Sequence, residues 1–240
     1  MITPLHYTGR SGGSARDAGP SRDVLGVVLA GGASTRMGVD KGRMELGGQT
    51  LVERAAKLLD VVADQVVLAT GSTARYSELG RASVLDRPEH EGQGPAAGLV
   101  AALDHARSRG LARVLVLACD MPWVEREALE GLLQASRTEN LDAVLFEAPL
   151  EGDVSETRLE PLLAVYHVRV LGPLLRALEA GGRRMIDFHK GFGTVRVDRW
   201  GRRMGARGAR WAKNVNTPED WRELERAGNR SDERTQEGRA

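Results

Sequence analysis

Several residue types and patterns are scarce in this chain of 240 residues, and each scarcity excludes a class of structure. The chain has one cysteine, Cys119, which excludes an internal disulfide and a cysteine-based zinc cluster. This cysteine usage is typical of the reducing cytoplasm, where we expect the protein to lie. No window approaches the ~18 apolar residues of a membrane span, so we expect no membrane partner. The formal net charge of +1 disfavours nucleic acid as a partner, because general nucleic-acid binders carry a larger basic excess.

Aromatic residues are also scarce, at 4% of the chain, whereas hydrophobic residues make up 41%. The core must therefore be built mainly from Leu, Val and Ala, and the length suits one α/β domain or two small ones. Residues 1–23 are rich in Gly, Ser and Arg and contain no apolar stretch. We expect a disordered extension there rather than a signal peptide, and a flexible tail over residues 228–240.

Between these ends, strand and helix patterns alternate along the chain. Strands are expected at residues 25–30, 65–70, 83–85, 113–118, 142–147, 162–166 and 194–197. Helices are expected at residues 50–62, 95–107, 125–136, 168–180 and 185–190, with a further helix that starts at Thr217. The alternation predicts a three-layer α/β/α fold with a mostly parallel sheet. Ligands of such sheets bind at the carboxyl ends of the strands.

A loop follows the first expected strand, and residues 29–41 read Leu-Ala-Gly-Gly-Ala-Ser-Thr-Arg-Met-Gly-Val-Asp-Lys. Its small residues allow backbone N–H groups to converge on an anion. Arg36 and Lys41 add positive charge where a polyphosphate would lie. The glycine spacing matches neither a Walker A loop nor the G-x-G-x-x-G of a dinucleotide fold. We interpret the segment as a phosphate-binding loop, with an ordinary glycine-rich turn as the alternative.

A second motif follows the apolar strand at residues 113–118, where the chain continues Cys119-Asp120-Met121-Pro122. A carboxylate at a strand end can hold a divalent cation against phosphate oxygens, and Mg²⁺ prefers one or two carboxylates together with phosphates and water. Alternatively, Asp120 caps the turn that follows. The phosphate-binding loop on a neighbouring strand favours the magnesium site.

These two motifs, together with Asn214-Val-Asn-Thr-Pro-Glu-Asp220, resemble the molybdenum cofactor guanylyltransferase family of MobA-like nucleotidyltransferases. The resemblance implies a Rossmann-like nucleotidyltransferase sheet in one domain over residues 24–227, with a nucleotide half at about 24–124 and an acceptor half at about 125–227. It also implies an enzyme that transfers GMP from GTP to the phosphate of molybdopterin, releases pyrophosphate and uses Mg²⁺ as its cofactor. GTP and molybdopterin are the implied partners, and molybdenum-cofactor insertion proteins are further candidates.

The resemblance also implies roles for individual residues. Lys41, Arg36 and Asp120 would be catalytic, and Asp120 would be the Mg²⁺ ligand, with Asn216 as a candidate second ligand. The nucleotide would be bound by Leu29, Ala30, Gly31, Gly32, Lys41, Thr70, Asp86, Gly94, Pro95 and Asp120. The acceptor would be bound by Arg183, Arg184, Asn214 and Asn216. Many members carry an Asn where this chain has Thr70, so that contact is either absent or supplied by Thr70.

The reaction itself needs no general base, because its acceptor is already an anionic phosphate; positioning and charge neutralisation suffice. Arg183 and Arg184 could equally form a solvated helix end. We expect residues 201–210 to be a solvated loop rather than a basic lip for the acceptor. A CTP-using relative is an alternative function, and so is a non-catalytic nucleotide-binding adaptor, although Lys41 and Asp120 speak against the adaptor.

Overall fold

The computed structural model describes residues 23–31, 40–137, 141–150, 153–182, 184–198 and 204–226. The expected extension at residues 1–23 lies outside the described residues except for Asp23, and so does the expected tail at 228–240. Gly32, Arg36 and Arg183 also lie outside them.

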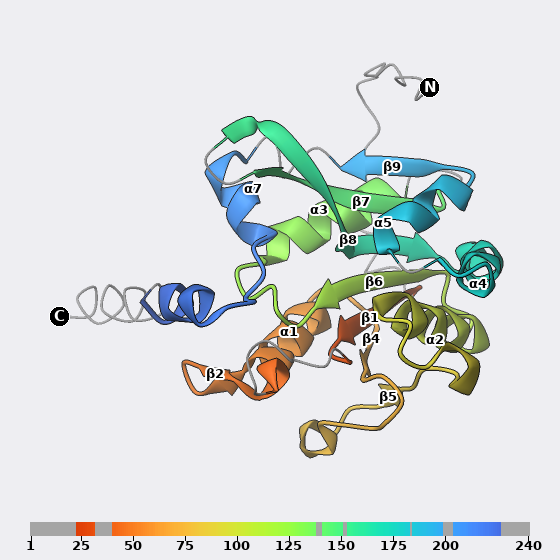
Figure 1. Ribbon diagram of the computed structural model, residues 1–240, viewed down its shortest axis with the longest axis horizontal. Coiled ribbons are helices and arrows are strands. Elements are labelled where there is room, and N and C mark those ends of the chain that lie inside the picture. Colours follow the sequence, from red (N-terminus) through yellow and green to blue (C-terminus); the bar gives the residue numbers. More distant parts are fainter. Residues whose placement is uncertain are drawn as a thin grey trace, which may run out of the picture.

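Within the described residues, a seven-stranded sheet in the order β5-β4-β1-β6-β8-β7-β9 forms the middle layer (Figure 1). Its strands are β1 (Val24–Leu29), β4 (Gln65–Ala69), β5 (Ser83–Val84), β6 (Arg113–Ala118), β7 (Ala143–Leu150), β8 (Asp153–His167) and β9 (Val195–Asp198). All neighbouring pairs are parallel except those of β8, which runs antiparallel to both β6 and β7. The predicted mostly parallel α/β sheet is therefore confirmed.

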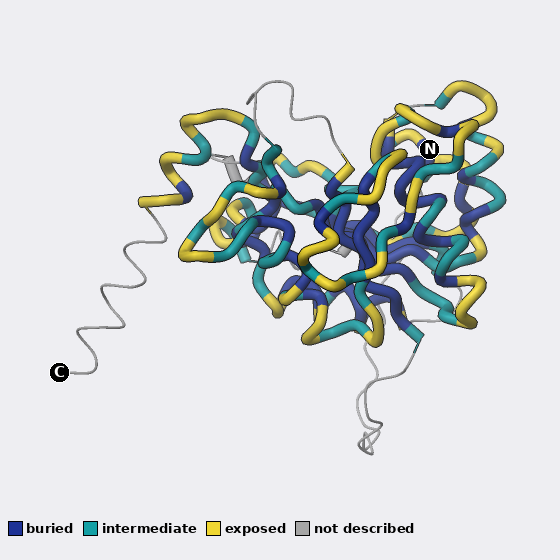
Figure 2. The backbone as a smooth tube through the Cα atoms, turned by 90° about the horizontal axis from the view of Figure 1, so that it is seen from below, coloured by how far each residue is buried: buried dark blue, intermediate teal, exposed yellow. Residues whose placement is uncertain are grey.

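Helices cover both faces of the sheet, so the predicted three layers are also confirmed. One face carries α1 (Leu51–Asp60), α3 (Arg126–Ser136) and α7 (Ala206–Trp211). The other carries α2 (Pro95–Ser108), α4 (Leu171–Glu179) and α5 (Met185–Phe188). The buried stretches of the chain lie inside, while the exposed ones lie at the rim (Figure 2). Among the described helices, none combines the length and apolar character needed to cross a membrane.

Short elements join these layers. They are the 3₁₀ helices η1 (Lys41–Arg43), η2 (Ser77–Leu79), η3 (Pro88–His90), η4 (Val168–Val170) and η5 (His189–Gly191), and the hairpin of β2 (Glu45–Leu46) and β3 (Gln49–Thr50). The side chain of Thr50 accepts the N–H of Glu53 at 3.2 Å and so caps α1. The predicted C-terminal helix covers residues 218–226 and begins, as expected, at Thr217, whose hydroxyl accepts the N–H of Asp220 at 3.2 Å.

One expectation from the sequence was wrong, and another was too short. Within the segment 201–210, residues 201–203 lie outside the described residues, and residues 206–210 belong to helix α7 rather than to a solvated loop, because the fully buried Trp211 anchors the segment 6.1 Å from the ring of Phe146. Arg207 also pairs with Glu125, which holds this helix against α3. The strand expected at 162–166 is real but forms only the last part of the much longer β8.

Candidate active site

A cavity of about 490 Å³ lies at the carboxyl ends of β1, β4 and β6, the position at which open α/β sheets bind ligands. Its volume falls in the range of small-molecule sites, about 300–1,000 Å³. The cavity is lined by Leu29, Ala30, Gly31, Asp40, Lys41, Gly42, Ala69, Gly71, Ser72, Tyr76, Asp86, Glu91, Gly92, Gly94, Pro95, Gly98, Ala118, Cys119, Asp120 and Leu162. Most of the residues predicted to bind the nucleotide therefore share one cavity.

Glycines shape the backbone of three segments that border this cavity. A Cβ atom on Gly31 would lie 2.7 Å from the backbone N of Gly71, so only glycine allows the loops after β1 and β4 to come this close. Helix α2 is preceded by Gly94, whose φ of 74° suits glycine, and Pro95 occupies its first turn. Because both residues line the cavity, the N-terminus of α2 borders it, and the helix dipole favours negative charge there.

Four predicted site residues from three distant parts of the chain meet at the edge of this cavity. The Nζ atom of Lys41 donates to Oδ1 of Asn216 at 2.7 Å and lies 3.9 Å from Oδ2 of Asp120. Nδ2 of Asn214 donates to Oδ1 of Asp120 at 3.3 Å. The N–H of Val215 donates to the backbone oxygen of Asp120 at 2.8 Å and fixes the loop of the two asparagines. The Asp120 carboxylate thus faces Lys41 and Asn214.

Burial raises the pKa of the Asp120 carboxyl above its ordinary value, although Lys41 and Asn214 oppose the shift. A cation bound there would remove part of this electrostatic cost. The described residues contain no group of three or more His, Cys, Asp or Glu side chains that could hold a metal ion by themselves. A single carboxylate fits a Mg²⁺ ion whose other ligands are phosphate oxygens and water. Burial raises the pKa of the Cys119 thiol to about 12, so this thiol stays neutral.

Asp86 and Thr70 differ in where the structure places them. Asp86 lines the cavity, and its pKa is raised by burial and by the nearby charge of Glu91. Thr70 does not line it: the hydroxyl of this buried residue donates to the backbone oxygen of Thr73 at 2.7 Å and holds a turn. Gly71 and Ser72 line the cavity at that point instead.

Arg184 lies apart from the cluster of Lys41, Asp120, Asn214 and Asn216. Its side chain is 78% exposed and approaches Asp187 at 3.8 Å, at the start of α5. It does not line the cavity at the carboxyl ends of β1, β4 and β6. This geometry fits the alternative of a solvated helix end better than acceptor binding.

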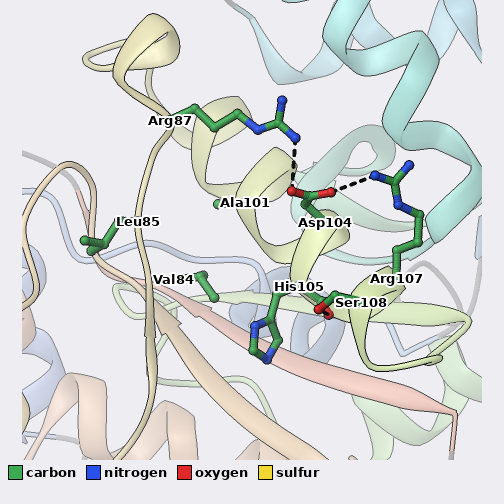
Figure 3. Close-up of a pocket in the computed structure, with 8 residues that line it drawn as sticks. All are labelled: Val84, Leu85, Arg87, Ala101, Asp104, His105, Arg107 and Ser108. Atoms are coloured by element: carbon green, nitrogen blue, oxygen red, sulfur yellow. Dashed lines mark hydrogen bonds and ion pairs between the residues drawn. The ribbon is translucent and has the colours of Figure 1, made fainter.

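Another cavity, of about 530 Å³, lies between the end of β5 and the outer side of α2 (Figure 3). Its charged side chains pair with one another: Asp104 accepts from Arg87 at 3.0 Å and from Arg107 at 2.9 Å. None of the predicted site residues lines it, and we place the active site at the carboxyl ends of the strands.

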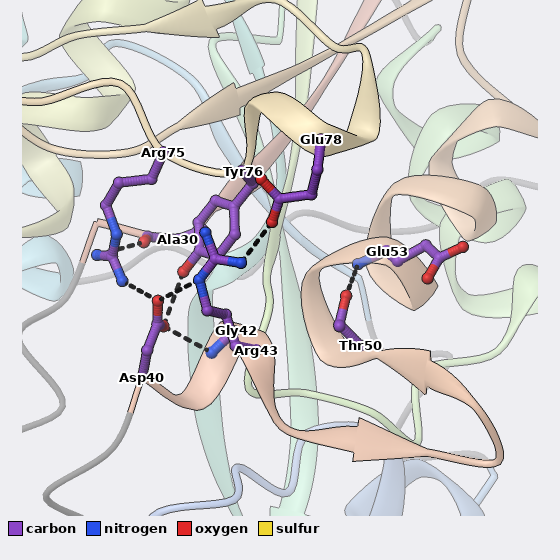
Figure 4. Close-up of polar contacts among 9 residues, drawn as sticks. All are labelled: Ala30, Asp40, Gly42, Arg43, Thr50, Glu53, Arg75, Tyr76 and Glu78. Carbon is purple, nitrogen blue, oxygen red and sulfur yellow. Dashed lines mark hydrogen bonds and ion pairs between the residues drawn. The ribbon is translucent and has the colours of Figure 1, made fainter.

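Asp40, the residue before Lys41, holds together a cluster of polar contacts that was not predicted from the sequence (Figure 4). Oδ1 of Asp40 accepts the hydroxyl of Tyr76 at 2.8 Å and the N–H of Gly42 at 3.0 Å, and Oδ2 pairs with Arg75. Burial alone would raise the pKa of Asp40, but the hydrogen bonds from Arg75 and Tyr76 outweigh it and lower the pKa. A Cβ atom on Gly42 would lie 2.4 Å from the Tyr76 hydroxyl, so a larger residue there would displace the Tyr76 ring. The cluster fixes η1 and with it the backbone of Lys41.

We expect Tyr76→Phe to lower both the stability of the fold and kcat. The change removes a hydrogen bond to a charged group, worth about 1.5–3 kcal/mol, and loosens the helix that carries Lys41. Thermal unfolding and steady-state rates measure the two effects. Tyr166→Phe is the matched control: this buried hydroxyl contacts Pro161 and His189 beneath the other helix layer, so the variant should lose stability and keep kcat. Equal kcat losses in the two variants would refute a link from Tyr76 to Lys41.

The sheet, the cavity at its carboxyl edge and the cluster around Lys41 and Asp120 define an α/β nucleotidyltransferase. The chain matches the MobA-like NTP transferase domain over residues 26–192, and it belongs to that family.

Proteins with sequences similar to this chain are named after the same activity. The chain is 38% identical to "Probable molybdenum cofactor guanylyltransferase" of Opitutus terrae over 166 residues, which cover 69% of this chain and 77% of that protein. It is 31% identical to the molybdenum cofactor guanylyltransferase of Albidiferax ferrireducens, covering 69% and 80%. The crystal structure of molybdopterin-guanine dinucleotide biosynthesis protein A from Archaeoglobus fulgidus is similar, with a TM-score of 0.69, 25% identity and coverage of 86% and 99%.

Proposed function

We propose that this protein transfers GMP from GTP to the terminal phosphate of molybdopterin, releases pyrophosphate and forms the guanine dinucleotide cofactor. The observation that carries the proposal is the meeting of Lys41, Asp120, Asn214 and Asn216 at the edge of a nucleotide-sized cavity. The names of the relatives supply the candidate substrates, GTP and molybdopterin. Cofactor-insertion proteins remain candidate partners downstream.

In the proposed reaction, an oxygen of the acceptor phosphate bonds to the α-phosphorus of GTP. The bond from that phosphorus to the α,β-bridging oxygen breaks, and its electron pair leaves with pyrophosphate. No protein group needs to take a proton from the acceptor, so the residues act by positioning and by neutralising charge. The ammonium of Lys41 would neutralise the phosphates, and the backbone of Leu29, Ala30 and Gly31, with Asp86, Gly94 and Pro95, would hold the nucleotide.

Mg²⁺ would be held by Asp120 and would supply further neutralisation of phosphate charge. Asn216 is the less suitable ligand, because its Oδ1 already accepts a hydrogen bond from Lys41. Asn214, which donates to Asp120, would orient that carboxylate.

The test is to incubate the protein with molybdopterin, Mg²⁺ and each nucleoside triphosphate in turn and to measure pyrophosphate. We expect release with GTP and little with CTP, ATP or UTP. Preferential release with CTP would favour a cytidylyltransferase instead. GTP binding without pyrophosphate release in the presence of molybdopterin would favour a non-catalytic adaptor and would refute the proposal.

A further inference from the structure

A further cavity, of about 430 Å³, adjoins the candidate active site through the two asparagines. It is lined by Pro149, Arg158, Glu160, Ala209, Lys213, Asn214, Asn216 and Asp220. The side chains of Asn214 and Asn216 bond to Asp120 and Lys41, which line the nucleotide cavity. The two cavities therefore meet at the place where GMP transfer would occur, and a second substrate in this cavity would lie beside the α-phosphate.

Arg158 is the charged group best placed to hold an anion in this cavity. Its Nε lies 2.6 Å from Oε1 of Glu160, and Nη2 donates to the backbone oxygen of Ala212 at 2.6 Å. The Arg158 side chain is nevertheless 48% exposed, whereas that of Glu160 is 13% exposed. Glu160 and the backbone oxygen of Ala212 thus hold the guanidinium in place, and it is still accessible to a ligand. This arrangement suits the bidentate binding of a phosphate.

Lys213 and Asp220, which also line the cavity, are likewise engaged within the protein. Lys213 pairs with Glu223 at 2.6 Å, with Nζ 5.7 Å from the Trp123 ring centre. Asp220 accepts the N–H groups of Asn216 and Thr217, both at 2.9 Å, and so holds the asparagine loop. Burial raises the pKa of Glu160, although the charge of Arg158 and the hydrogen bond from it oppose the shift.

We propose that this second cavity binds the acceptor substrate, a phosphate monoester, and that Arg158 binds its phosphate. Glu160 is a positioning residue, which acts by orienting Arg158. The inference rests on the proposed function, since the acceptor is the second substrate of that reaction. Arg158 contacts the acceptor oxygens that do not attack, while the remaining oxygen bonds to the α-phosphorus of GTP and pyrophosphate leaves.

Steady-state kinetics with molybdopterin as the varied substrate test this assignment. Arg158→Ala should raise the KM for molybdopterin by about tenfold or more, the effect of losing at least one charge-assisted hydrogen bond, and leave the KM for GTP unchanged. Arg158→Lys should recover part of the loss, because it restores the charge without the planar fork. Glu160→Gln should also raise the KM for molybdopterin, but by a smaller factor than Arg158→Ala does. Arg126→Ala removes an exposed arginine paired with Glu130 and should change neither constant.

Direct binding separates failure of this assignment from failure of the proposed function. Equilibrium dialysis of molybdopterin without GTP needs no turnover, and the Arg158 variants should bind it more weakly than the wild type and the Arg126 variant. If no nucleotide yields pyrophosphate but this difference persists, the proposed reaction is wrong and the cavity assignment stands. Equal binding of molybdopterin by wild type, Arg158→Ala and Arg158→Lys, or no binding by the wild type, would overturn the assignment.

Discussion

Replacing Lys41 by alanine is expected to lower kcat by about 100- to 1000-fold, the range found when one preorganised donor to a developing charge is removed. The Lys41 side chain is only 14% exposed, and its Nζ is held 2.7 Å from Asn216 and 3.9 Å from Asp120. Water cannot easily replace an ammonium in that position. Pyrophosphate release with saturating GTP, Mg²⁺ and molybdopterin gives the rate.

The control for this experiment is Lys57→Ala. Lys57 is also paired with a carboxylate, Glu53 at 2.8 Å, but it lies on the outer side of α1 and is 52% exposed. Such a surface pair contributes about 0.3–0.5 kcal/mol, and kcat should not change. Thermal unfolding should show that the Lys41 variant is folded. A near-normal kcat in a folded Lys41→Ala protein would remove this lysine from the proposed mechanism.

Asp120→Asn is expected to abolish Mg²⁺-dependent turnover while making the protein more stable at neutral pH. Burial raises the pKa of Asp120, so folding disfavours the charged carboxylate that prevails near pH 7. An amide of the same shape removes that cost and also removes the anionic ligand that Mg²⁺ needs. The gain in the free energy of unfolding, measured without nucleotide or metal, should shrink as the pH falls and the wild-type carboxyl takes up a proton.

Asp60→Asn provides the comparison, because Asp60 is a 42% exposed partner of Arg81 at the end of α1. This variant should show unchanged turnover and no gain in stability. If Asp120→Asn responds to Mg²⁺ as the wild type does, the alternative is supported, in which Asp120 caps the turn that follows it. Loss of stability together with loss of turnover would show that the native fold depends on the negative charge.

Much of the fold could be predicted because its signals are local. The strand at residues 113–118 is a continuous apolar run, which is typical of a strand buried on both faces of a parallel sheet, and β6 has the same bounds. Helix α2 begins at Pro95, as its sequence indicated. The rule that parallel strands end at one edge sufficed to expect Asp120 beside the residue 29–41 loop. The hydrogen bond from Lys41 to Asn216 brings the C-terminal motif to the same edge of the sheet, as expected, while its role there stays a prediction.

The remaining features depend on contacts that local patterns do not encode. Strand β8 begins with polar residues, so only its apolar end at 162–166 resembled a strand, and Arg158 and Glu160 were missed as site residues. The role of Asp40 was not predicted, because its partners, Arg75 and Tyr76, are more than thirty positions away. The roles predicted for individual residues stay predictions until the variants above are measured.

The reversed direction of β8 has a consequence for how such an enzyme can diversify. Because β8 runs against β6, Leu163 pairs beside Leu117 near the end of β6, and the earlier residues of β8 project past that edge. One strand therefore supplies Leu162 to the nucleotide cavity and Arg158 and Glu160 to its neighbour. If Arg158 binds the acceptor as proposed, substitutions within a few positions of this strand would change acceptor choice and leave the glycine loops of the other cavity untouched.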